Sequence, residues 1–179
     1  MSEWGMGVLD RREDEEVWIA DGRERRVVCG SKKEMSAGYK VAIVGATGAV
    51  GEEMLRVLER RKFPVSEVGL FASGRSAGRR MKFFGEEVEV RELRRDSLDG
   101  YDFALFSAGS GVSREYAPIV AKAGVVVVDN SSAFRMEPEV PLVVPEINGE
   151  DVFLHRGIIA NPNCTTAITL MALAPLHWL

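Results

Sequence analysis

A glycine-rich junction between a strand and a helix constrains this fold more than any other feature. Residues 39–45, "YKVAIVG", form a nearly continuous apolar run with β-branched side chains, which is typical of a strand buried on both faces of a parallel sheet. Residues 48–63 then place apolar side chains at helical spacing, and Pro64 predicts the end of that helix. The sequence "GATGAVG" therefore predicts a tight turn between a buried strand and an amphipathic helix.

The same alternation of strands and helices continues along the chain. We predict a strand, a hairpin turning at Gly85, a strand, a helix and a further strand in the ranges 67–73, 80–93, 101–109, 111–124 and 125–130. Strands that alternate with helices favour right-handed crossovers. The fold class is therefore α/β, a Rossmann-type doubly wound sheet that is mostly parallel.

Composition narrows the kinds of ligand. The chain of 179 residues is long enough for one sizeable core, and no apolar run approaches the roughly 20 residues that span a bilayer. We therefore expect no membrane partner. A net charge of -4 argues against an extended nucleic-acid-binding surface, so we also expect no nucleic-acid partner. Two distant cysteines, Cys29 and Cys164, predict neither a disulfide framework nor a metal site.

Residues 1–38 differ from the remainder, because they mix dense charge of both signs with short apolar pieces. We expect a disordered extension or leader there. Asp10, Glu13 and Asp14 are among the acids that make this segment a poor transit peptide, and no apolar stretch follows a basic start as in a secretory signal. We expect the cytoplasm or the plastid stroma as the compartment.

The glycine turn has the context of a dinucleotide-binding loop. Glycines let a pyrophosphate approach the backbone, and the following helix offers free N–H groups and a partial positive charge. The spacing is GxxGxxG rather than the commoner GxGxxG, so a hydroxyl and two further amides could also meet phosphate. The alternative is a glycine-rich turn without a ligand. The predicted cofactor-binding residues of the turn are Gly45, Thr47, Gly48, Ala49, Val50 and Gly51.

The end of the second strand distinguishes the two nicotinamide cofactors. An NAD site favours an acid there, whereas "ASGRSAG" offers Ser73, Arg75 and Ser76, which suit the 2′-phosphate of NADP. The alternative is a flexible polar loop. At the end of the third strand, three further residues support the cofactor site, namely Ser107, Ala108 and Gly109.

Cys164 opens a predicted helix in "NPNCTTAITL". The positive end of the helix dipole favours the thiolate there, which is how an activated nucleophile is placed. Asn163 could donate to an oxyanion. The alternative is a small buried hydrophobic side chain. His155 and His177 are both poor candidates for a base, since His177 lies too far along the same helix.

Five segments occur together in an order that resembles the aspartate-semialdehyde dehydrogenase family. They are "GATGAVG", "ASGRSAG", "VVDNSSAFRM", "VPLVVPEINGED" and "NPNCTT", and the resemblance runs from about Tyr39 to the last residue. N-acetyl-gamma-glutamyl-phosphate reductase is the nearer competitor, but a glycine would be expected there in place of Asn163. Glyceraldehyde-3-phosphate dehydrogenase also has a cysteine that opens a helix after a nucleotide-binding domain, but its cysteine motif is different.

The resemblance implies NADP-dependent reductive dephosphorylation of L-aspartyl-4-phosphate to L-aspartate 4-semialdehyde, a step toward lysine, threonine and methionine. Cys164 would be the nucleophile, and Arg135 would bind the phosphate with Asn130 beside it. Asn163 is the third predicted substrate-binding residue. The alternative for Arg135 is a surface ion pair with Glu137 or Glu139.

The family's chains continue into a second domain that supplies a histidine, a glutamine, basic residues and most of a dimer interface. We therefore expect residues 39–163 to form the NADP-binding domain and residues 164–179 to begin an incomplete catalytic and dimerisation domain. The chain by itself would then be inactive, and the complete form would be a homodimer or homotetramer. The alternative is a non-catalytic module that binds NADP or sequesters subunits.

Overall fold

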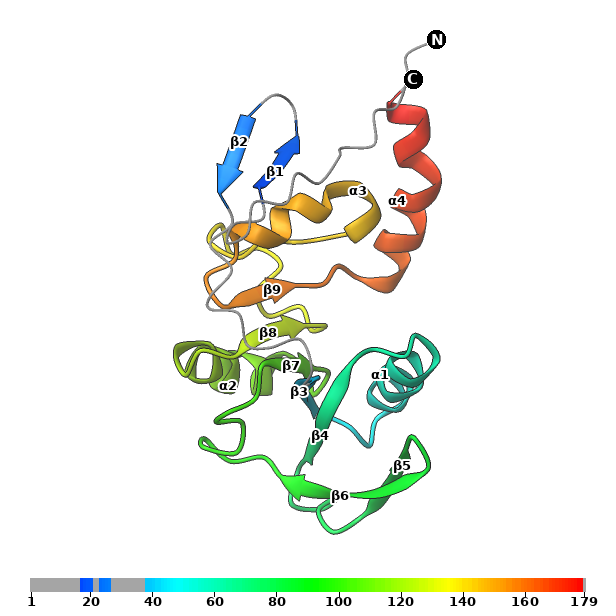
Figure 1. Cartoon of the computed structure of the whole chain (residues 1–179), viewed down its shortest axis with the longest axis vertical. Helices are drawn as coiled ribbons and strands as arrows, with labels where there is room; N and C mark the ends of the chain where they lie inside the picture. Colours follow the sequence, from blue (N-terminus) through cyan, green and yellow to red (C-terminus); the bar gives the residue numbers. More distant parts are fainter. Residues whose placement is uncertain (1–16, 21–22, 27–37, 179) are drawn as a thin grey trace. The chain divides into compact units, whose positions relative to one another are not determined.

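The computed structural model describes residues 17–20, 23–26 and 38–178, in two units (Figure 1). In the first unit, Met1–Ala37, the strands β1 (Val17–Ala20) and β2 (Arg23–Arg26) pair antiparallel. Apart from these strands and Gly38, the predicted extension over residues 1–38 lies outside the described residues. The second unit, Gly38–Leu179, contains the predicted nucleotide-binding fold.

A seven-stranded sheet forms the centre of the second unit, in the order β5-β6-β4-β3-β7-β8-β9. From β3 the chain moves outward to β4 and β6, and then returns to the other side of β3 for β7, β8 and β9. Every pair in the sheet is parallel except β5 with β6. The strands are β3 (Tyr39–Val44), β4 (Val65–Ala72), β5 (Arg80–Phe83), β6 (Glu86–Glu92), β7 (Phe103–Phe106), β8 (Val126–Asp129) and β9 (Ile158–Ala160).

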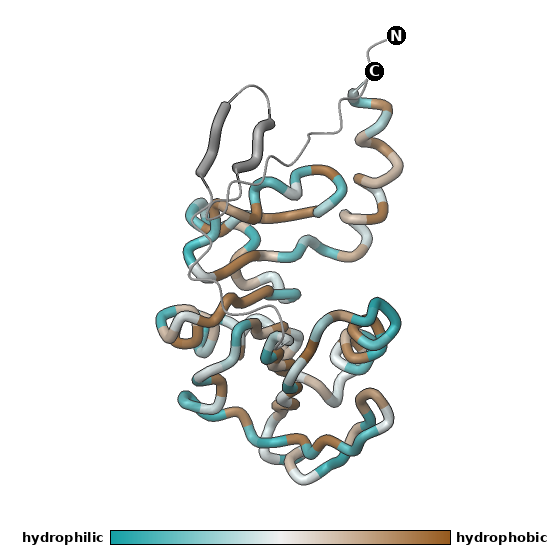
Figure 2. The backbone as a smooth tube through the Cα atoms, viewed as in Figure 1, coloured by the Kyte–Doolittle hydropathy of each residue, from teal (hydrophilic) through white to brown (hydrophobic). Residues whose placement is uncertain are grey.

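Two helices cover the opposite faces of this sheet, which confirms the doubly wound prediction. Helix α1 (Ala49–Arg60) packs Leu55 into a core with Ile43 and Leu70, and helix α2 (Ser110–Lys122) belongs to the core on the other face. Because side chains alternate along a strand, Ile43 faces one core while Val44 faces the other. Apolar residues accordingly colour the central strands in Figure 2.

The predicted hairpin is confirmed, and its turn consists of Phe84 and Gly85 between β5 and β6. Both residues have positive φ, at 47° and 84°. A two-residue loop with φ positive at both positions matches the twist of an antiparallel hairpin, and glycine adopts it without steric cost.

The segment between β8 and the cysteine holds structure that the sequence pattern does not predict. It contains the short helix α3 (Pro145–Asn148), the 3-10 helix η1 (Gly149–Leu154) and β9. The three residues of β9 are too few to show a strand pattern, so our predicted sheet lacked this edge strand. The helix predicted after the cysteine is confirmed as α4 (Cys164–His177). Within the described part of the chain, no helix has the length and apolar character that crossing a membrane requires.

Candidate active site

Residues predicted for the site follow directly on the carboxyl ends of parallel strands. Gly45 comes after β3, Ser73 after β4, Ser107 after β7 and Asn130 after β8. The strand order reverses between β3 and β7, and ligands of doubly wound sheets bind at such a switch point. The fold therefore brings the predicted cofactor residues and the loops before Cys164 to one edge of the sheet.

The first turn is built on Gly45. Its φ is +86°, and a Cβ at this position would lie 2.7 Å from the carbonyl carbon of Ser107. The Gly45 and Ala46 amides both donate to the carbonyl oxygen of Phe71, at 2.8 and 3.1 Å. The turn is thus held between β4 and β7, and only glycine fits its conformation and its contact with β7.

The other two glycines place the start of α1. A Cβ on Gly51 would lie 2.7 Å from the Cα of Ala46, so the helix approaches the turn closely. Gly48 is the N-cap and no side chain caps the helix, while Ala49 and Val50 are exposed. The first N–H groups of a helix have no partner within it, and this end is positive. The turn therefore leaves free N–H groups at the positive end of a helix, and pyrophosphate binding there stays a prediction.

The loop after β4 exposes Ser73 and Arg75, and the amide of Ser76 donates to the carbonyl of Ser73 at 2.8 Å. Sequence reasoning noted no acid in this loop, but it missed Glu92 at the end of neighbouring β6. A Cβ on Gly74 would lie 2.7 Å from a carboxylate oxygen of Glu92. That carboxylate accepts from Arg94 Nη2 at 3.0 Å, so its charge is paired.

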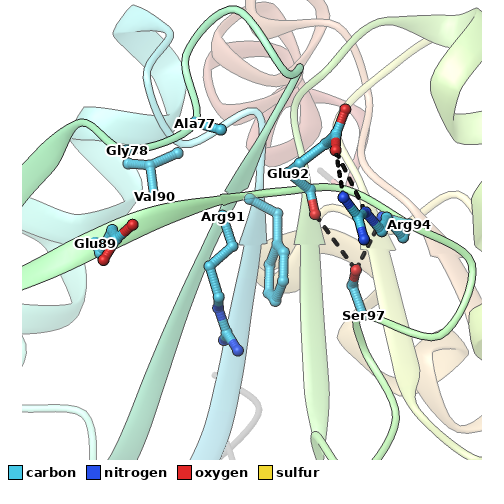
Figure 3. Close-up of a pocket in the computed structure, with 9 residues that line it drawn as sticks. Ala77, Gly78, Glu89, Val90, Arg91, Glu92, Arg94 and Ser97 are labelled. Carbon is cyan, nitrogen blue, oxygen red and sulfur yellow. Dashed lines mark hydrogen bonds and ion pairs between the residues drawn. The ribbon is translucent and has the colours of Figure 1, made fainter.

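A cavity of about 350 Å³ adjoins this loop (Figure 3). The guanidinium of Arg91 lies 4.7 Å from the centre of the Phe71 ring and donates to the Tyr101 hydroxyl at 2.5 Å. Burial raises the pKa of Tyr101, and the neighbouring Arg91 opposes that rise. The sequence pattern did not predict this cavity, which is lined by Phe71, Ala77, Gly78, Glu89, Val90, Arg91, Glu92, Arg94 and Ser97.

Arg135 joins the loops that follow β8 and β9. Its Nε donates to the carbonyl oxygen of Asn161 at 2.9 Å, and its Nη2 donates to the carbonyl oxygen of Asn130 at 3.1 Å. The alternative ion pair is not what the structure has, because Arg135 pairs with neither Glu137 nor Glu139, and Glu139 pairs with Arg156 at 2.5 Å. Arg135 is half-buried at the sheet edge, and the carbonyl oxygens of two loops orient it.

Asp129 lies beneath these loops and is fully buried. Its carboxylate accepts from the Ser113 hydroxyl on α2 and from the Ser131 hydroxyl, both at 2.6 Å, and from the Ser131 amide at 3.2 Å. A buried carboxylate needs such donors, since burial without them is costly. The three bonds fix the turn that contains Asn130 to both β8 and α2.

Cys164 is exposed and is the first residue of α4, as predicted. Asn163 is the N-cap, and its side-chain oxygen accepts from the Thr165 amide at 2.9 Å. The oxygen of this carboxamide is therefore used by the helix, and only its NH2 group could donate to an oxyanion. His177 ends the same helix, roughly 20 Å away at 1.5 Å per residue. The Nδ1 atom of His155 accepts from the Gly157 amide at 2.9 Å, within its own turn.

Acidic, cysteine and histidine side chains do not gather into a metal-binding group anywhere among the described residues. The predicted lack of a metal site remains a prediction for the whole chain.

Comparison with known proteins places this geometry in a family. Residues 40–155 match the model of the semialdehyde dehydrogenase NAD-binding domain. Aspartate-semialdehyde dehydrogenase of Aquifex aeolicus is 58% identical, over 78% of this chain and 42% of that protein. The Bacillus subtilis enzyme of the same name is 51% identical, over 80% of this chain and 41% of its own length.

Solved structures agree with the sequence comparison. Aspartate semialdehyde dehydrogenase II from Vibrio cholerae, complexed with ASA, aligns with a TM-score of 0.75 and 51% identity, over 78% of this chain and 46% of that one. The Candida albicans enzyme with NADP aligns with a TM-score of 0.65 and 27% identity, over 77% of this chain and 46% of that one. This chain spans about two fifths of the length of the two relatives compared by sequence. The fold, the glycine turn and these matches together show that the chain belongs to the semialdehyde dehydrogenase family.

Proposed function

We propose that this chain provides the NADP-binding part and the nucleophile of an aspartate-semialdehyde dehydrogenase. Residues 39–163 would form the NADP-binding domain, and residues 164–179 would begin the catalytic domain. The reaction is the NADP-dependent reductive dephosphorylation of L-aspartyl-4-phosphate to L-aspartate 4-semialdehyde. One observation carries the proposal: the exposed Cys164 begins the helix that follows the β9 loop, and Arg135 is anchored to that same loop at the end of the sheet that holds the glycine turn.

The chain's own residues fit the cofactor. The glycine turn and the start of α1 would hold the pyrophosphate, and Ser73, Arg75 and Ser76 would hold a 2′-phosphate. The nearby Glu92 does not argue for NAD, because its carboxylate is paired with Arg94. The solved relative from Candida albicans is described with NADP. When bound, NADPH supplies the hydride that reduces the acyl group.

Cys164 carries the covalent chemistry. Its thiolate attacks the acyl carbon of the substrate, the bond to the phosphate oxygen breaks, and inorganic phosphate leaves as a thioester forms. Hydride supplied by the bound cofactor would leave the acyl carbon tetrahedral, with its oxygen as an oxyanion. As the carbonyl forms again, the carbon–sulfur bond breaks, which releases the aldehyde and regenerates the thiolate.

Arg135 binds the phosphate in this proposal. Its bonds to the two carbonyls use Nε and one N–H of Nη2, so the end of the guanidinium with Nη1 and Nη2 can face an anion. Asn130 lies beside it, and the NH2 group of Asn163 could donate to the oxyanion that forms at the attacked carbonyl.

The reverse reaction tests the proposal. We would follow NADPH formation from L-aspartate 4-semialdehyde, with and without inorganic phosphate, in the 179-residue chain and in the product of its complete reading frame. Phosphate-dependent formation that is lost in Cys164→Ala is the expected result for the complete product. A folded product that binds NADPH but forms none contradicts the substrate, and N-acetyl-glutamate semialdehyde is then the next substrate to assay.

A binding titration tests the cofactor separately. Arg75→Ala should weaken NADPH binding to the chain about tenfold or more and leave NADH binding nearly unchanged, since a charge-assisted bond to the 2′-phosphate is lost. Arg79→Ala, an exposed arginine that follows the same loop, is the matched control. Equal losses for both nucleotides would contradict the assignment of Arg75.

A further inference from the structure

Asn161, a residue to which the sequence pattern gave no role, forms a closed ring of hydrogen bonds with Asn130 and Arg135. Its side-chain Nδ2 donates to Asn130 Oδ1 at 2.5 Å, and its own carbonyl accepts from Arg135 Nε at 2.9 Å. Arg135 completes the ring through the Asn130 carbonyl at 3.1 Å. The amide of Asn161 also donates to the Asp129 carbonyl at 2.8 Å. Asn161 is thereby fixed through its amide, its carbonyl and its side chain.

This ring decides how Arg135 is presented. The guanidinium is a planar fork, and its side edge, Nε with Nη2, lies on the two carbonyls. The carboxamide pair between Asn130 and Asn161 keeps those two carbonyls in place relative to each other. If the pair is removed, the loops keep the bond from the Asn161 amide to the Asp129 carbonyl, but the side-chain bond that orients the two carbonyls under Arg135 is lost. The end of the guanidinium then loses its fixed direction.

The same ring decides where Cys164 begins its helix. Only two residues separate Asn161 from the cysteine. Pro162 is buried and has a fixed φ, and Asn163 is held by its bond to the Thr165 amide. The backbone from Asn161 to Cys164 is therefore conformationally restricted, and a displacement of Asn161 would also displace the thiol.

We infer that Asn161 is a positioning residue, whose carboxamide bond to Asn130 sets both the anion-binding end of Arg135 and the place of Cys164. This inference rests on the proposed function for the meaning of the anion and the thiol. Asn161 contacts neither reacting group in this role. It acts through Arg135 and through the two residues that lead to the cysteine.

Alkylation of Cys164 by iodoacetamide tests the inference without requiring catalytic activity. The chain is prepared with Cys29→Ser, so that mass spectrometry reports one thiol. The alkylation rate near neutral pH is measured without phosphate and at increasing concentrations of inorganic phosphate. Phosphate bound at Arg135 should protect the thiol from alkylation. We expect Asn161→Ala to slow alkylation about fivefold and to raise the half-protecting phosphate concentration about fivefold, the change that one lost hydrogen bond produces.

Two further variants separate positioning from a general loss of structure. Asn161→Leu keeps the approximate size but has neither a donor nor a charge, so it should show the same slower alkylation. Asn148→Ala is the matched control, because its carboxamide also ties a loop, accepting from the Val144 amide at 2.8 Å and donating to the Leu142 carbonyl at 3.0 Å. Urea midpoints of all variants are compared, and the control should lose stability without changing either thiol measurement.

The pair is tested by a double-mutant cycle. If Asn130 and Asn161 act together, the double alanine variant should alkylate at the rate of either single variant, since the shared bond is lost only once. A parental alkylation rate in Asn161→Ala, or an equal change in Asn148→Ala, overturns the inference. If phosphate fails to protect the parent chain, the anion role of Arg135 in the proposed function is wrong, while the alkylation rates still decide the role of Asn161.

Discussion

The close approach of α1 to the glycine turn gives a prediction whose size follows from the structure. In Gly51→Ala the new methyl carbon would lie 2.7 Å from the Cα and 2.8 Å from the carbonyl oxygen of Ala46, and it would overlap the carbonyl of Gly45. Carbon atoms in contact prefer about 3.5 to 4.0 Å, so the helix must move by about 1 Å. All of these neighbours are backbone atoms, which no side-chain rotation can remove from the contact.

The expected cost combines two opposing effects. Overpacking a closed site costs about 1 to 3 kcal/mol, while replacing glycine by alanine within a helix returns up to about 1 kcal/mol. We expect a net loss of about 1 to 2 kcal/mol in the free energy of unfolding. With a urea dependence of about 2 kcal/mol per molar, the midpoint should fall by about 0.5 to 1 M.

Urea unfolding followed by far-UV circular dichroism measures this change. Gly111→Ala is the matched control, because Gly111 also lies in the first turn of a helix and a Cβ there has no neighbour within 4 Å. The control should be unchanged or slightly more stable. If Gly51→Ala unfolds at the same urea concentration as the control, the turn tolerates a methyl group and our account of its packing is wrong.

Three further predictions concern single side chains. Asn163→Ala removes the N-cap of α4 and should cost about 1 kcal/mol, with faster amide hydrogen exchange in its first turn; equal exchange would contradict the cap. Because burial raises the pKa of Tyr101 above 10.0, its contribution to stability is complete below pH 10 and is lost as pH rises through the raised value. The free energy of unfolding of Tyr101→Phe should therefore fall less steeply above pH 10 than that of the parent chain, and equal slopes would refute this. Asp129→Ala leaves the buried Ser113 hydroxyl without its partner and should cost about 2 to 4 kcal/mol in urea, whereas a loss below about 1 kcal/mol would disprove its structural role.

Local patterns predicted the strand–turn–helix unit because each signal lies within a few residues. The apolar run before Gly45, the glycine spacing and the helical periodicity up to Pro64 all indicate the same unit, and the structure confirms it. The hairpin at Gly85 was predicted for the same reason. By contrast, β9 contributes only Ile158, Ile159 and Ala160, and its place depends on pairing with β8, which no local pattern records.

The site shows the same division between local and distant information. That Cys164 begins a helix could be predicted, and the capping role of Asn163 could also have been, since asparagine is a preferred N-cap. The partners of Arg135 could not, because the carbonyl of Asn161 lies 26 residues further along the chain. The ion-paired carboxylate near Gly74 could not be predicted either, because Glu92 approaches the loop from an adjacent strand.

The parallel arrangement of the sheet also has a consequence for the order in which it can fold. Val41 pairs with both Val68 and Phe103, so the central strand needs contacts that close long loops. Closing such loops costs conformational entropy before the stabilising strand contacts form, and this slows folding. The hairpin of β5 and β6 is the exception, since its strands are joined by Phe84 and Gly85 alone. Hairpins form in about 1 to 10 μs, so this edge of the sheet can be structured before the strands that carry the site have met.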